Sequence, residues 1–252
     1  MIISTMKNKN NTTKKILCIV LSGVFWILVW WGVALYINQE LLVASPKQVA
    51  FRLVELMGEG SFWMSVLYSL LRVSLGYLLA VITAVILSTL THASQLVYHI
   101  SSPLLSIIKA VPVASFIILA LIWMNKDIIP VFITFLIVLP IVWGNLHRGL
   151  KETDTKLLEM CSVYNVPLCR QISGIYIPSV KPYFTSACKT AVGLAWKSGV
   201  AAEVLCKPEF SIGGHMYDAK IYLETTDVFA WTAVTVVLSV IIETIITAKS
   251  EK

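Results

Sequence analysis

Long stretches without acidic or basic residues are the feature of this sequence that most restricts its fold. Between Glu59 and Lys109 the only Asp, Glu, Lys or Arg is Arg72. The chain of 252 residues is 57% hydrophobic and 13% charged, whereas a soluble domain carries about 25% charged residues. It therefore lacks the polar residues to cover a water-soluble globule, and the hydrocarbon core of a bilayer is the expected solvent. The same composition excludes a disordered chain and a disulfide-rich secreted scaffold.

Apolar runs of sufficient length predict membrane-spanning helices, since roughly 20 helical residues cross the hydrocarbon core. The sequence predicts six such helices, near residues 16–37, 65–90, 103–124, 128–147, 184–206 and 228–247. Pro112 and Pro140 are predicted to kink their helices. A cleaved signal peptide is the alternative for the first run, but this run is too long and Pro46 follows its only small-residue site. No sustained alternation indicates membrane strands. We therefore expect an all-α integral membrane protein.

The predicted organisation is an N-terminal tail (residues 1–15), a membrane domain (16–247) and a short C-terminal tail (248–252). A charged, amphipathic loop, residues 148–183, joins the fourth and fifth predicted helices. With the N-terminus inside, eleven Lys and Arg residues fall in the inner segments and five in the outer segments. Because positive residues concentrate on the cytoplasmic side, both termini and the 148–183 loop are predicted to be cytoplasmic, in the cell membrane.

A short helix is predicted inside this loop, and a second amphipathic piece is predicted to end at Ile177-Pro178. Thr153 or Asp154 can cap its start, Asn165 suits a left-handed residue after its end, and Pro167 prevents its continuation. Its apolar residues recur at helical spacing: Leu157, Leu158, Cys161 and Tyr164. An exposed apolar face needs a partner surface, so the helix either docks on another protein or lies on the membrane interface or its own bundle. The spacing does not decide between these alternatives.

Charged residues within the predicted spans are further candidates, because each is costly in lipid unless it is paired or hydrated. Lys189, Trp196 and Glu203 are seven residues apart and share a helix face that suits an anionic or zwitterionic solute. Alternatively, Lys189 and Glu203 reach water from opposite ends of the span. Arg72 is a further candidate pathway residue, and it reaches water or pairs with Glu203. An ion pair is favoured over contact with a solute. No spacing of Cys, His or acidic residues indicates a metal or catalytic site.

Several motifs together resemble the permease subunits of binding-protein-dependent ABC importers, in particular the nitrate, sulfonate and taurine subgroup. Glu159-Met160-Cys161, then Asn165 and Ile175-Tyr176-Ile177-Pro178, is similar to the E-A-A–x3–G…I-x-L-P loop of these permeases. Further similar segments are residues 69–77, 102–104, 109–112, 195–197 and 200–203. This sequence has Met160 and Cys161 in place of two alanines, Asn165 in place of a glycine, and Ile177 in place of a leucine. The resemblance covers roughly residues 60–247.

The resemblance implies a type I importer bundle whose coupling helix contacts a separate ATPase. The implied coupling residues are Leu157, Leu158, Glu159, Met160, Cys161, Tyr164, Asn165 and Pro178. The implied assembly has two permease copies in a homodimer, two cytosolic ATPase subunits and an external solute-binding protein, with no nucleic-acid partner. The chain has no phosphate-binding loop of its own, so it is not expected to be an enzyme or to bind a cofactor, and its partner uses the ATP.

The implied substrate is a small solute: an anion such as nitrate, a sulfonate or taurine, or a vitamin precursor such as a thiamine precursor or riboflavin. The main alternative function is a secondary transporter driven by an ion gradient. That function predicts inverted repeats and an acidic residue at the bilayer midplane, whereas no repeat is detected and Glu203 is off-centre. An integral-membrane enzyme would need converging acids or histidines, which the sequence does not indicate.

Overall fold

The computed structural model describes residues 21–39 and 41–250 of the chain, and side chains as far as residue 246. The predicted N-terminal tail, the start of the first predicted helix and the last two residues of the chain lie outside this part. All regular elements of the described residues are helical. In chain order they are Leu21–Ile37, α2 (Pro46–Met57), α3 (Gly60–Ala93), α4 (Gln95–Ala110), α5 (Val113–Trp123), α6 (Ile129–Lys151), α7 (Thr155–Val163), α8 (Leu168–Gln171), the π-helical turn η1 (Ile172–Tyr176), α9 (Ile177–Cys206), α10 (Ile212–Ile221) and α11 (Thr225–Ser250).

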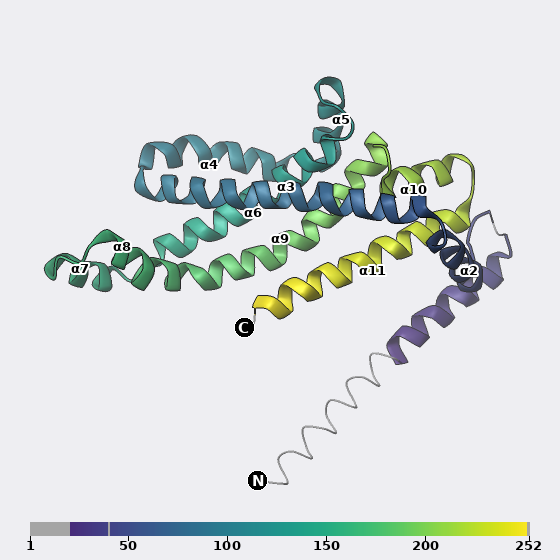
Figure 1. Cartoon of the computed structure of the whole chain (residues 1–252), viewed down its shortest axis with the longest axis horizontal. Coiled ribbons are helices and arrows are strands. Elements are labelled where there is room, and N and C mark those ends of the chain that lie inside the picture. The colour runs from purple at the N-terminus through teal and green to yellow at the C-terminus, as the bar shows by residue number, and fades with distance from the viewer. Residues whose placement is uncertain (1–20, 40, 251–252) are drawn as a thin grey trace, which may run out of the picture.

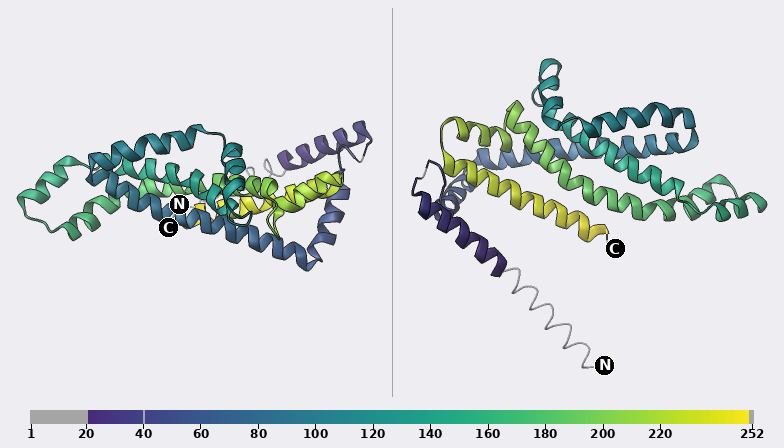
Figure 2. Two further views of the ribbon diagram at one scale, coloured as in Figure 1. Left: turned by 90° about the horizontal axis from the view of Figure 1, so that it is seen from above. Right: turned by 180° about the vertical axis from the view of Figure 1, so that it is seen from behind.

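The helices form an elongated bundle with two different ends (Figure 1). We call the end that carries α7 and α8 the loop end, and the opposite end, which carries α2 and α10, the α10 end. Both further views show the same separation (Figure 2). The centre of the bundle is α6 with α3 and α9 packed along it, while α11 packs against α9 and α10. The long helices therefore connect the two ends directly.

Small residues allow α3, α6 and α9 to approach closely. A side chain at Gly199 of α9 would place its Cβ 2.5 Å from Val73 Cγ2 and 2.9 Å from Thr134 Oγ1. On α3, a Cβ at Gly76 would collide with the carbonyl oxygen of Val131 of α6. Close packing of helix backbones is a common source of association in membranes, where apolar surface alone gives little driving force between helices. These contacts fix the three central helices relative to one another.

The outer surface of the bundle is apolar. On α3 the exposed residues Leu71, Leu75, Leu78, Ile82 and Ile86 lie on one face. Among the described residues, α3, α6 and the part of α11 from Thr225 to Ile246 are long and apolar enough to cross a bilayer. The bent pair α4–α5 is a fourth candidate. These features confirm the predicted all-α membrane fold.

Two of the six predicted crossings do not coincide with a described helix that is both long and apolar enough to cross a bilayer. The described part of the first one, Leu21–Ile37, is a shorter apolar helix. The fifth lies in α9, which begins at Ile177 rather than near residue 184 and carries four charged residues: Lys181, Lys189, Lys197 and Glu203. The first and fifth crossings therefore stay predictions.

The prediction of one continuous span at residues 103–124 is wrong. Residues Gln95–Ala110 and Val113–Trp123 are separate helices bent by 104° from each other. The helix breaks at Val111, which has an extended backbone, and Pro112 follows with φ −58° and ψ 136°. A proline disfavours the α conformation of the residue before it, so the break falls where the sequence predicted only a kink. Pro140, also predicted to kink its helix, lies within the continuous helix α6.

Candidate functional site

The first candidate site is the segment from Asp154 to Gln171 at the loop end, which we call the loop segment. Asp154 caps α7, because its side chain accepts a hydrogen bond from the backbone N–H of Lys156 at 2.9 Å. Asn165 has φ 50°, which confirms the predicted left-handed residue after the helix. The backbone N–H of Val166 closes the turn by donating to the Cys161 carbonyl at 2.9 Å. Local hydrogen bonds thus preform the helix.

The exposed face of α7 differs in part from the predicted stripe. Cys161 is 5% exposed and Leu158 is half-buried, so these two side chains face their own chain. Tyr164 is 75% exposed. The apolar residues that are exposed on this segment are Leu157, Met160, Val163, Tyr164 and Leu168. Leu157, Met160, Val163 and Tyr164 recur at helical spacing, and Leu168 follows in α8. The predicted stripe with i, i+1, i+4, i+7 spacing did not include Val163 or Leu168.

The remaining predicted coupling residues border this face or lie farther along the chain. Glu159 is exposed on α7. Pro178 is exposed in the first turn of α9. The prediction that an amphipathic piece ends at Ile177-Pro178 is wrong, since η1 leads into α9 there without a break.

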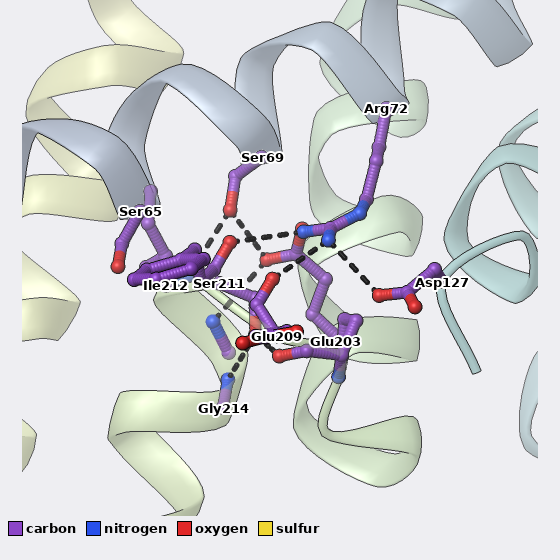
Figure 3. Close-up of polar contacts among 12 residues, drawn as sticks. Ser65, Ser69, Arg72, Asp127, Glu203, Glu209, Ser211, Ile212 and Gly214 are labelled. Carbon is purple, nitrogen blue, oxygen red and sulfur yellow. Dashed lines mark hydrogen bonds and ion pairs between the residues drawn. The ribbon is translucent and has the colours of Figure 1, made fainter.

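The second candidate site is a charge cluster at the α10 end (Figure 3). We define it as Ser69 and Arg72 of α3, Asp127 of the α5–α6 turn, and Glu203 of α9. Arg72 Nη1 lies 3.7 Å from Glu203 Oε1, and Arg72 Nη2 lies 3.1 Å from Asp127 Oδ1. The predicted pairing of Arg72 with Glu203 is confirmed. The guanidinium is mostly buried, so the pair is shielded from water.

Glu203 joins α3 and α9 to the start of α10. Its Oε2 accepts hydrogen bonds from Ser69 Oγ at 2.7 Å and from the Gly213 N–H at 3.3 Å. Ser69 Oγ in turn accepts from the Ile212 N–H at 3.0 Å. Two of the free N–H groups of the α10 N-terminus are therefore satisfied by buried side chains. Within the described residues, Glu203 Oε1 is buried and has no hydrogen-bond partner, so the 3.7 Å ion pair is its main compensation.

Backbone carbonyls between α9 and α10 complete the coordination of Arg72. Nη2 donates to the Glu209 carbonyl at 2.7 Å, and Nη1 donates to the Phe210 carbonyl at 3.0 Å. The left-handed residues Lys207 and Phe210, with φ near 49° and 47°, turn the chain so that these carbonyls face α3. Sequence analysis missed these contacts, because residue type gives no signal for a backbone carbonyl.

The face predicted for Lys189, Trp196 and Glu203 is buried over much of its length. Trp196 is 1% exposed, and its indole N–H donates to the Thr235 carbonyl of α11 at 3.0 Å. Glu203 is fully buried, and Lys189 is half-buried. In this chain, therefore, Trp196 and Glu203 contact neighbouring helices, and no observation places a solute beside them.

The segment after α9 packs over the α10 end. Ser211 Oγ caps α10 by accepting a hydrogen bond from the Gly214 N–H at 3.0 Å. Residues 211–214 therefore form the cap and first turn of this helix. His215 stacks on Trp231 at 4.6 Å and lies 2.9 Å from Ser65 Oγ. Burial lowers the pKa of His215 below its usual value. Within the described part of the chain, no group of three or more His, Cys, Asp or Glu residues is arranged to hold a metal ion.

Comparison with known proteins assigns the chain to a family. Residues 76–248 match the family described as binding-protein-dependent transport system inner membrane component. The chain belongs to this family. It is therefore the membrane component of a transport system that depends on a binding protein, as the resemblance in the sequence predicted, and the ion-gradient and enzyme alternatives are set aside. Arg72 and Ser69 lie just before the matched region, whereas Asp127, Glu203 and the loop segment lie within it.

Relatives of this chain are named for several small solutes. The nitrate import permease protein NrtB of Synechococcus elongatus is 26% identical over 221 residues, 84% of this chain and 79% of the relative. The bicarbonate transport system permease protein CmpB of Synechocystis sp. is 28% identical over 166 residues, 65% of this chain and 58% of the relative. The formylaminopyrimidine transport permease protein ThiX of Halalkalibacterium halodurans is 26% identical over 170 residues, 67% of this chain and 68% of the relative.

Proposed function

We propose that this chain is the permease subunit of an ATP-driven importer and that its loop segment docks on a cytosolic ATPase. The observation that supports this proposal is the capped, preformed helix α7, whose apolar residues Met160, Val163 and Tyr164 are exposed. Exposed aromatic and methionine side chains are enriched in the centres of protein interfaces. The long helices α6 and α9 flank the segment directly, so a movement at the docked helix would reach the α10 end by rigid-body motion.

The proposed orientation places the loop end in the cytoplasm. Arg148, Lys151, Lys156, Arg170 and Lys181 lie on or near the loop segment, in agreement with the positive-inside rule. The proposed assembly is a homodimer of this chain with two ATPase subunits inside and a solute-binding protein outside. The α10 end would then face the binding protein.

The proposed substrate is a small anion or a pyrimidine vitamin precursor. Nitrate, bicarbonate and formylaminopyrimidine occur in the names of the relatives, and sulfonates, taurine and riboflavin remain among the candidates from the sequence. Lys189, Trp196, Glu203 and Arg72 stay candidate pathway residues. For Arg72 and Glu203 a solute contact would require the charge cluster to open. The two residues hold each other, backbone carbonyls before α10 also hold Arg72, and the Gly213 N–H of α10 also holds Glu203.

The docking proposal is tested with the chain reconstituted in nanodiscs together with its ATPase and binding protein. The variant Met160→Asp places a charge in the centre of the exposed apolar face, and Ser162→Asp adds the same charge on the opposite, exposed side of α7. We expect Met160→Asp to lower ATPase co-purification and binding-protein-stimulated ATP hydrolysis roughly tenfold, which corresponds to about 1.4 kcal/mol at the interface. Ser162→Asp should remain close to wild type.

Equal behaviour of the two variants would contradict docking through this face. Leu158→Asp is a poorer test, because Leu158 is half-buried and its substitution would also affect folding. Binding measurements on the cognate binding protein with nitrate, bicarbonate, taurine and a formylaminopyrimidine then separate the substrate classes.

A further inference from the structure

Two adjoining pockets at the loop end differ sharply in chemistry. The first is an apolar groove of about 460 Å³ between α3, α6, η1 and α9. The second is a polar pocket of about 350 Å³ between α3, α4 and α6. His92 lines both, so the two volumes meet at the end of α3. Each lies within the roughly 300–1,000 Å³ typical of ligand sites.

The apolar groove has the lining expected for a hydrocarbon chain. Its walls include Val85, Leu146, Ile172, Ile177 and Phe184, with few polar atoms exposed inside it. Val85, Ile172 and Ile177 are themselves exposed at the surface of the chain, so the groove is open from outside. Tyr176 of η1 makes an edge contact with His92, with ring centroids 6.0 Å apart, and this contact ties the far wall to α3.

The polar pocket is basic. Its titratable lining residues are His92, Tyr98, His99, His147 and Lys151, and the lining contains no Asp or Glu. A neighbouring pocket, lined in part by the same residues, adds Arg148 and Glu152. The Glu152 carboxylate is already engaged, because Arg148 lies 3.5 Å away and the Tyr183 hydroxyl donates to it. Lys151 therefore has no acidic side chain in the lining of its own pocket, and an anion would supply its counter-charge.

The hydrogen bonds of Thr91 fix the orientation of His147. Thr91 Oγ1 donates its single hydrogen to the Ser88 carbonyl at 3.1 Å and accepts from the Trp143 indole N–H at 3.1 Å. His147 Nδ1 lies 3.2 Å from the same oxygen, so Nδ1 must be the donor. Stacking on Tyr98, at 4.8 Å between centroids, holds the ring in place. His147 therefore forms a fixed wall of the polar pocket.

We infer that the paired pockets bind one anionic phospholipid, with its phosphate in the polar pocket and an acyl chain in the apolar groove. The site lies where the apolar sequence of α3 ends at the polar turn beginning at Thr91, which is the depth at which a headgroup meets hydrocarbon. Basic residues between membrane helices are suited to anionic headgroups, and a bilayer supplies the acyl chain at high local concentration. A second protein helix would fill the groove but would leave the basic pocket without a counter-charge.

The test is native mass spectrometry of the full chain after incubation with phosphatidylglycerol or phosphatidylcholine in detergent. The variants are Lys151→Gln in the polar pocket and Val180→Trp in the apolar groove, and Lys47→Gln, an exposed lysine at the α10 end, is the matched control. We expect preferential retention of phosphatidylglycerol. Lys151→Gln should weaken retention roughly fivefold, the change expected from about 1 kcal/mol per basic residue near an anionic surface. Val180→Trp should weaken both lipids, and Lys47→Gln neither.

Three outcomes would overturn the inference. One is equal retention of the two lipids, and another is retention that neither pocket variant changes. The third is displacement of phosphatidylglycerol by inorganic phosphate alone, which would indicate a soluble-anion site without a lipid. Lipid retention is measured without ATP, ATPase or solute, so its failure would leave the proposed transport function unaffected.

Discussion

The charge cluster and the loop segment place the polar and apolar residues of one chain in opposite situations. At the α10 end, Arg72 and Glu203 are buried and are held by each other, by Ser69 and by backbone groups of the following segment. At the loop end, Met160 and Tyr164 are apolar and remain exposed on a helix that its own caps already stabilise. The charge cluster is thus held together within one chain, whereas α7 presents an exposed apolar face.

This difference separates the roles of the two regions. A network of contacts within the chain contributes to stability, so its disruption lowers the free energy of unfolding of this chain. An exposed apolar face contributes little to the fold, and its disruption is observed only in the assembly. Identical substitutions in the two regions should therefore have different consequences, which matched pairs of variants measure.

The largest expected effect is the loss of Arg72. In Arg72→Met the Glu203 carboxylate loses its counter-charge, and breaking a buried pair in this way costs about 3–5 kcal/mol. The control is Arg148→Met at the loop end, whose i,i+4 pair with Glu152 is exposed and contributes about 0.3–0.5 kcal/mol. Thermal unfolding in detergent micelles should show a large loss for the first variant alone. Equal losses would remove the distinction between the two ends.

Glycines give the next comparison. Gly199→Ala adds a Cβ only 2.5 Å from Val73 Cγ2, and overpacking of this kind costs about 1–3 kcal/mol. Gly174→Ala, in η1 at the loop end, has no atom within 4 Å of the added Cβ and is expected to be neutral or slightly stabilising. The same unfolding measurement tests both. A destabilised Gly174→Ala would show that η1 is packed more tightly than its surroundings indicate.

Helix caps provide a smaller effect in the same direction. Ser211→Ala removes a buried cap whose hydroxyl also donates to the Pro208 carbonyl, and the expected cost is about 1–2 kcal/mol. Asp154→Ala removes the exposed cap of α7, and about 0.5–1 kcal/mol is expected, mainly as fraying of that helix. Hydrogen exchange should localise the second change to residues after 154. Global destabilisation by Asp154→Ala would place the loop segment in the core of the fold.

The smallest expected effect is a pH dependence at the α10 end. Burial lowers the pKa of His215 in the folded chain, so below its ordinary pKa of about 6.5 the unfolded chain binds a proton more readily than the folded chain. Stability is therefore expected to fall as the pH decreases below about 6.5. Unfolding temperatures of wild type and His215→Gln between pH 7.5 and 5.5 should diverge in slope, and parallel curves would exclude His215 as a source of the dependence.

Much of this fold could be predicted from sequence because its signals are long and one-sided. Uncharged runs located α3, α6 and α11, and the cost of a charge in lipid predicted that Arg72 would pair with Glu203. Asp154 and Asn165 marked the two ends of α7, because capping and left-handed residues depend on local backbone geometry.

The remaining features depend on tertiary contacts that composition does not encode. The 104° bend between α4 and α5 adds to what Pro112 alone predicted, since a proline marks a break but not its angle. Cys161 and Tyr164 belong to the same helical stripe, yet one is buried and the other exposed, because periodicity does not state which part of a stripe faces its own chain. The carbonyls of Glu209 and Phe210 reach Arg72 only through a turn built by left-handed residues.

The proposed contact between the exposed face of α7 and an ATPase subunit is tested most directly by site-specific photo-crosslinking. A photoreactive amino acid is placed at position 160 on the exposed apolar face, and at position 162 on the opposite side as the control. With the assembled transporter in nanodiscs, we expect a crosslink to the ATPase from position 160 and little or none from position 162. Crosslinks from position 160 only to lipid, or equally from both positions to the ATPase, would contradict it.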